Sequence, residues 1–203
     1  MEFGIGGPVR CSDGEAGTLV ALIADPVRTA LAHIAVEPPH RPGDARLVPV
    51  GTVASADASG VTLSCTREEF RALPAFRDVE FMPYSPEFGD LGAALAMPYY
   101  GLPPVDTPVF VDAVPAGQVE IRRHDHVQAS DGGIGRVEGL VVGPGGAITH
   151  VLLQEGHLWG RREVAIPVSA VERIDQEGVH VRLSRDEIGA LPEVGARPPG
   201  GGV

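Results

Sequence analysis

The clearest strand pattern in this sequence is SDGGIGRVEGLVVGPGGAITHVLLQ, residues 130–154. Apolar residues dominate two runs, 135–142 and 147–154, and Pro-Gly-Gly stands between them at 144–146. Short apolar runs separated by Gly and Pro are typical of β-strands joined by a tight turn. The stretch therefore predicts a β-hairpin.

The same stretch has a counterpart earlier in the chain. A shift of 118 positions superimposes Ser12-Asp13-Gly14 on Ser130-Asp131-Gly132, and His33 corresponds to His150 after one residue of slippage. Identical residues continue downstream at the same shift: Pro49 and Pro167, Val53 and Val171, Asp57 and Asp175, Gly60 and Gly178, Arg67 and Arg185, Glu69 and Glu187, Leu73 and Leu191. Self-similarity at a fixed shift indicates an internal repeat of about 70 residues, the size of one small domain.

The remainder of each copy also has the pattern of strands. In the second copy, short runs at 127–129, 163–167, 171–174 and 179–183 each predict a strand. Two Ser/Thr-x-x-Glu patterns, Thr66 with Glu69 and Ser184 with Glu187, are capping boxes that predict a short helical turn at the end of each copy. The sequence therefore predicts an all-β protein of two small β-barrels with about six short strands each.

Charge and composition exclude several classes of partner and compartment. The chain has 27 acidic and 16 basic residues, and its net charge of −11 disfavours binding to nucleic acid. No run approaches the roughly 18 apolar residues of a membrane span, and the first ten residues lack a signal-peptide pattern. Two cysteines are too few for a secreted disulfide scaffold. We therefore expect a cytoplasmic protein without a cofactor.

Several segments of both copies resemble the PRC-barrel family. In the second copy these segments are Ser130-Asp131-Gly132, Thr149-His150-Val151 and Val164-Ala165-Ile166-Pro167-Val168, and in the first copy they are Val9 through Gly17, Asp25-Pro26 and Leu47-Val48-Pro49-Val50. The resemblance implies PRC-barrel-like domains at 1–75 and 121–194, of the tandem, stand-alone bacterial type. It also implies a docking role, because the barrel is a docking module in known relatives.

A Pro- and aromatic-rich connector, 76–120, separates the two copies. A flexible linker would be richer in Gly and Ser and poorer in aromatic rings. We therefore expect the connector to pack as a strap that covers the barrels or sets their relative orientation. The final segment, 195–203, has too few apolar residues to build a core and is expected to form a disordered tail.

The cysteines and two histidines each allow two interpretations. Cys11 and Cys65 stand where the second copy has apolar residues, which favours a buried apolar role, and the alternative is a redox pair. His124 and His126 are two apart on an extended segment, so their imidazoles point to the same side and are suited to begin a metal site. The alternative for the histidines is a solvated strand edge.

The segment GHLWGRR, residues 156–162, is the candidate partner-binding loop. It places Trp159 beside His157, Arg161 and Arg162, and exposed Trp with Arg is typical of interface hot spots. The alternative is that Trp159 folds back over the barrel. No Ser/His/Asp or Cys/His spacing typical of catalysis is recognisable, so an enzyme is not expected.

These features together predict a non-catalytic docking or adaptor protein whose partner is another protein. The alternative function is a small-molecule or metal-binding module that uses the groove between the barrels. For assembly, two arrangements remain open. Either the two copies pair about a pseudo-two-fold axis, or an exposed strand edge makes the chain a homodimer.

Overall fold

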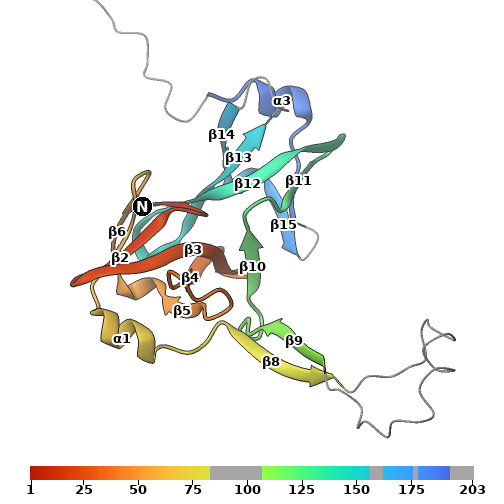
Figure 1. Cartoon of the computed structure of the whole chain (residues 1–203). Helices are drawn as coiled ribbons and strands as arrows, with labels where there is room; N and C mark the ends of the chain where they lie inside the picture. The colour runs from red at the N-terminus through yellow and green to blue at the C-terminus, as the bar shows by residue number, and fades with distance from the viewer. Residues whose placement is uncertain (83–106, 156–161, 176–177, 193–203) are drawn as a thin grey trace, which may run out of the picture.

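The computed structural model describes residues 1–82, 107–155, 162–175 and 178–192, and most of them lie in β-strands. The first half of the chain builds one sheet, drawn in red to orange in Figure 1. Its consecutive neighbours are β5 (Arg46–Pro49), β4 (Ala30–Glu37), β3 (Gly14–Asp25), β2 (Pro8–Cys11), β7 (Gly60–Leu63) and β6 (Val53–Asp57). A seventh strand, β10 (Val119–Arg122), pairs with β3.

The second half builds a sheet with the same strand order. Its consecutive neighbours are β14 (Arg162–Pro167), β13 (Ile148–Glu155), β12 (Gly132–Val142), β11 (His126–Ala129), β16 (Gly178–Val181) and β15 (Val171–Asp175). Its seventh strand, β1 (Glu2–Gly4), pairs with β12. The all-β prediction is confirmed, and the equal strand order agrees with the sequence repeat. Within the described residues no ladder joins the two end strands of either sheet; the turns η1 (Val50–Thr52) and η3 (Val168–Ala170) connect them along the chain.

The strands β1 and β10 occupy equivalent positions in the repeat, and each pairs with the sheet of the other half. Phe3 of β1 lies opposite Leu140 of β12, and Ile121 of β10 lies opposite Leu22 of β3. At the shift of 118 residues, Phe3 is equivalent to Ile121 and Leu22 is equivalent to Leu140. The same pairing is therefore formed twice, once from each half into the sheet of the other half. The halves therefore exchange strands about a pseudo-two-fold axis.

One hydrophobic core runs through both halves. Both exchanged apolar pairs belong to it, and each of their side chains is at most 1% exposed. Backbone hydrogen bonds also cross between the halves: Ile5 N donates to Glu138 O at 2.8 Å, and Ile148 N donates to Thr29 O at 2.9 Å. Since apolar burial is the main favourable contribution to folding, the shared core couples the stability of each half to the other.

Both predicted capping boxes are present. Thr66 precedes α1 (Arg67–Ala72) and Ser184 precedes α3 (Arg185–Gly189); each hydroxyl accepts from the backbone N–H of Glu69 or Glu187, and that glutamate accepts in return. The bonds to the carboxylates lower the pKa of both glutamates. The aspartates of the two Ser-Asp-Gly turns also cap: Arg67 N donates to Asp13 Oδ1 at 2.8 Å, and Arg185 N donates to Asp131 Oδ1 at 2.9 Å. Each half is thus fastened where its last element meets its first hairpin.

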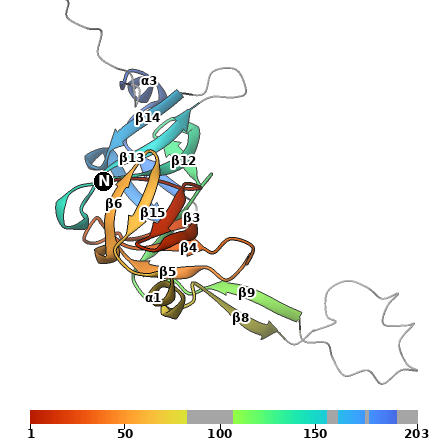
Figure 2. The ribbon, with the colours of Figure 1, turned by 60° about the vertical axis from the view of Figure 1, so that its left-hand side comes forward.

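Part of the connector forms an antiparallel ribbon, β8 (Arg77–Met82) with β9 (Thr107–Asp112), which extends away from the two larger sheets (Figure 2). The root of the ribbon is anchored in the body. Phe76 is fully buried, its N–H donates to Ala45 O at 2.7 Å, and its carbonyl accepts from Ala113 N at 2.6 Å. Within the described chain, β8 and β9 pair only with each other.

Candidate functional site

Most of the candidate partner-binding loop lies outside the described residues. His157, Trp159 and Arg161 fall in the segment 156–161, which the structure does not describe. Arg162 is described, as the first residue of β14. Its guanidinium donates to the carbonyl of Gly189 at 2.6 Å and to the carbonyl of Leu191. Arg162 therefore clamps the end of α3 onto the second sheet.

The first half uses a different arginine for the same task. Arg46 Nη1 donates to the carbonyl of Leu73, the repeat equivalent of Leu191, at 3.2 Å, and its Nη2 donates to Asp44 Oδ1 at 2.7 Å. In the repeat, Asp44 is the equivalent of Arg162. The two arginines that make these clamps therefore lie two positions apart in the alignment of the two copies. For this reason the internal repeat did not reveal them.

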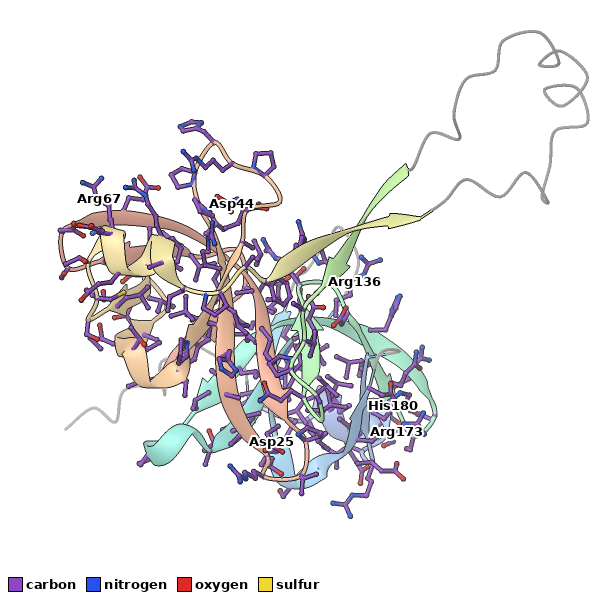
Figure 3. All side chains as sticks on the ribbon, turned by 90° about the horizontal axis from the view of Figure 1, so that it is seen from below. Asp25, Asp44, Arg67, Arg136, Arg173 and His180 are labelled. Atoms are coloured by element: carbon purple, nitrogen blue, oxygen red, sulfur yellow. The ribbon has the colours of Figure 1, made fainter. Side chains whose placement is uncertain are left out.

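Beside this clamp lies a cavity of about 270 Å³ on the first half. We call it the arginine cleft, because its lining includes four arginines together with apolar residues: Arg41, Arg46, Arg67 and Arg71, with Phe70 and Pro38. Two acidic residues, Glu15 and Asp44, also line it. Figure 3 shows Arg67 and Asp44 at the α1 end of the first half, whereas the exposed Arg136 lies in the second half. The sequence analysis did not single out this cluster, because its members come from β3, α1 and the segment from 38 to 46.

The ion pairs of the cleft leave guanidinium groups accessible. Asp44 pairs with Arg46 at 2.7 Å and with Arg41 at 3.7 Å, and Asp13 pairs with Arg67 at 3.7 Å. The side chains of Arg41 and Arg67 are 70% and 50% exposed. Arg71 is exposed on α1, and within the described residues no acidic group lies within 4 Å of its guanidinium. The cleft therefore keeps hydrogen-bond donors directed to solvent.

A second cavity, of about 340 Å³, lies at the junction of the halves. We call it the junction cavity; its charged lining consists of Glu2, Asp57, Arg123, Glu138 and Glu163. Arg123 Nε pairs with Glu138 Oε2 at 3.0 Å, while Glu138 Oε1 is buried and has no hydrogen-bond partner among the described residues. Glu163 is exposed at the rim of the cavity; partial desolvation of its carboxyl and the negative charges of Glu2 and Glu138 raise its pKa.

The raised pKa of Glu163 gives a pH-dependent prediction. The carboxyl of Glu163 binds its proton more tightly in the folded protein than in the unfolded chain. Its contribution to the free energy of unfolding is therefore fully present below the unfolded pKa of about 4.5 and is lost as pH rises through the higher pKa of the folded state. Glu163→Gln is expected to raise the free energy of unfolding at pH 7 by less than about 1 kcal/mol, since the group is solvent-screened. Urea unfolding at pH 7 and near pH 4 measures the gain, which should vanish at the lower pH. An equal gain for the exposed Glu172→Gln would show that general charge reduction is the cause.

The histidines that the sequence suggested as metal ligands lie in and after a turn. His124 adopts a positive φ of 76° and its backbone N–H donates to Val137 O at 3.0 Å; His126 begins β11, and both are exposed. Within the described residues, no group of three or more His, Cys, Asp or Glu side chains has metal-binding geometry. The repeated His33 and His150 make different bonds, His33 with Gln118 at 3.2 Å and His150 with Thr149 at 3.1 Å.

The two cysteines lie in contact in the first half and are both free thiols. Cys11 is buried in the core, and burial together with the neighbouring Cys65 raises the pKa of its thiol to about 12. Because the thiolate is the reactive form, a thiol with this pKa is a poor nucleophile near pH 7. The arrangement fits the predicted apolar role of Cys11.

One further polar cluster lies on the β15–β16 hairpin. Asp175 forms an ion pair with Arg173 Nε at 2.8 Å. His180 Nε2 lies 3.4 Å from Asp175 Oδ1 and 3.3 Å from Arg173 Nη2. Figure 3 shows Arg173 and His180 side by side in the second half. The contacts join neighbouring strands, so this cluster stabilises the hairpin locally.

Comparisons with protein-family models and with curated proteins gave no match for this chain. None of the helices in the described ranges could span a lipid bilayer.

Proposed function

We propose that this chain is a non-catalytic docking module, in which two interlocked PRC-barrel-like halves hold a binding ribbon for a protein partner. The observation that carries the proposal is the ribbon β8–β9, which leaves the body and, within the described chain, has both outer edges unpaired. An outer strand edge presents a row of backbone donors and acceptors that another strand can pair with.

The ribbon is rooted firmly enough to present such an edge. Besides the buried Phe76, Arg77 lies 3.6 Å from Glu37, and Ala75 forms a bridge with Arg46. A two-stranded ribbon is marginally stable in water when nothing covers it. Added strands from a partner would supply the missing pairing, which supports a docking role for this element.

The test compares the full chain with a chain whose ribbon is shortened. Arg77 and Asp112 are cross-strand partners, so their Cα atoms lie about 5 Å apart and an Asn-Gly turn can replace residues 78–111. A protein captured by the full chain from its native extract would be identified, purified and titrated against both forms. We expect at least about tenfold weaker binding to the shortened chain, because the strand edges are gone.

Circular dichroism and thermal unfolding of the shortened chain provide the control, since the core of the two halves does not depend on residues 78–111 in this proposal. Equal affinity of both chains for the purified partner would contradict docking through the ribbon. Failure of the full chain to bind any protein would favour the other candidate function, a small ligand held in the junction cavity.

A further inference from the structure

We infer that the arginine cleft binds an acidic peptide segment of the docking partner, with Arg41 and Arg71 as the residues that recognise its carboxylates. This inference rests on the proposed docking function and names the chemistry of the partner. The cleft concentrates four of the chain's 16 basic residues around one cavity, against two acidic residues in its lining. In the described part of the chain, the cleft is therefore a locally positive concave site on a protein with a net charge of −11.

The repeat shows that the fold does not require the charge of Arg71. At the equivalent position the second half has Gly189, and it builds the same sheet and the same closing helix. The charge of Arg67 is kept as Arg185, and the clamp of Arg46 is made by Arg162. Arg46 has the clamp on Leu73 as a structural task. Arg71 lies in the last turn of α1 and has no comparable contact among the described residues, so its guanidinium is available to a ligand.

The free donors of the cleft suit carboxylates. A guanidinium has five N–H donors in a planar fork that matches a carboxylate, and a charge-assisted bond of this kind is about twice as strong as a neutral one. Asp44 engages Arg41 only at 3.7 Å, and Arg71 has no ion pair in the described part of the chain. A carboxylate entering the cleft can therefore form bonds that the protein itself leaves unmade.

The size and floor of the cleft favour a peptide side chain. Pro38 and Pro39 line the cavity and supply accessible apolar surface beside the arginines, which suits the aliphatic stem of a glutamate. The volume of about 270 Å³ lies below the roughly 300–1,000 Å³ of cavities that hold whole small-molecule ligands. The phosphate backbone of a nucleic acid extends well beyond a cavity of this size, so most of its charges would lie against the acidic remainder of the chain, whereas a single carboxylate stays within the arginine cluster.

The cleft is also connected to the root of the ribbon. Gly43, in the segment that carries Arg41, donates its N–H to Glu37 Oε1 at 2.7 Å, and the same carboxylate pairs with Arg77 of β8 at 3.6 Å. One glutamate thus holds both the loop of the cleft and the first residue of the ribbon. A partner strand on the ribbon would place its flanking residues close to the cleft.

The test titrates the full chain with a fluorescein-labelled hexaglutamate peptide, followed by fluorescence anisotropy, with hexaglutamine as the uncharged control peptide. The double variant Arg41→Glu and Arg71→Glu is expected to weaken hexaglutamate binding at least about tenfold, because two charge-assisted contacts become repulsive. The matched control is Arg136→Glu, which reverses an exposed charge on β12 and should change the affinity less than about twofold. All variants must keep the thermal unfolding temperature of the parent chain.

Three outcomes would overturn the inference: absence of hexaglutamate binding, equal weakening by Arg136→Glu, or complete competition by inorganic phosphate at the peptide's own concentration. The last would identify a general anion site. Failure here is distinguishable from failure of the docking function. If the purified partner still discriminates between the full and ribbon-shortened chains while the cleft variant binds it normally, the docking function stands and the cleft assignment is wrong.

Discussion

Phe3→Ala is expected to lower the free energy of unfolding by about 3–5 kcal/mol, the usual cost of removing a fully buried phenylalanine ring. Phe3 is completely buried although it is the third residue of the chain. It lies in β1 opposite Leu140, so its pairing partner belongs to the sheet of the other half. A loss of this size is a large fraction of the 5–15 kcal/mol that stabilises a typical domain.

Urea unfolding followed by circular dichroism measures this loss. Ile121→Ala provides the internal comparison, because Ile121 is the repeat equivalent of Phe3 and its removal is expected to cost about 2–5 kcal/mol. Both variants should unfold in a single transition, since one core spans the two halves. A cost below about 1 kcal/mol for Phe3→Ala would show that β1 contributes little to the shared core.

Gly178→Ala is expected to lower the free energy of unfolding by about 3 kcal/mol. Gly178 has a φ of +129°, a conformation that L side chains rarely adopt, and an added Cβ would lie 2.1 Å from the carbonyl oxygen of His126. To relieve this overlap, β16 must move away from β11, and their parallel pairing is lost. The equivalent Gly60 meets Pro8 O at 2.4 Å with a φ of +136°, so Gly60→Ala should have a similar effect.

The control for this prediction is Gly189→Ala. An added Cβ at Gly189 meets no atom within 4 Å, and Gly189 lies in α3, where alanine is the better helix former. This substitution should leave the stability unchanged or raise it by up to about 1 kcal/mol. Thermal and urea unfolding of the three variants measure the difference. Equal effects of Gly178→Ala and Gly189→Ala would contradict the close approach of β16 to β11.

Local elements were the predictable part of the fold. The hairpin of 130–154 appears as β12, the turn η2 (Pro144–Gly146) and β13, and both capping boxes form at the predicted residues. The strand β12 begins earlier than the run 135–142, because Gly132 already belongs to it with a φ of +134° and Ser130-Asp131 make the preceding turn. Such elements are predictable because strand alternation, turn residues and caps act over a few neighbouring positions.

The candidate site was less predictable. Of the four residues proposed for partner binding, the described Arg162 is a clamp on α3, and the other three lie outside the described residues. The arginine cleft escaped notice because Arg41, Arg67 and Arg71 are scattered over 31 residues in no recognisable motif. Only the packing of α1 against β3 and the loop before β5 brings them around one cavity.

The repeat can be recognised in the sequence because equivalent residues recur at one shift, and the strands and the capped turn of each copy can be recognised because they depend on residues close together in the chain. Which sheet receives β1 and β10 cannot be recognised in this way and follows from the folded structure. Leu22 and Leu140 are equivalent residues of the repeat, so a strand carrying Phe3 could pair equally well beside either of them. The backbone hydrogen bonds of the two pairings would be alike. The choice between the two sheets therefore depends on how the whole chain closes around one shared core.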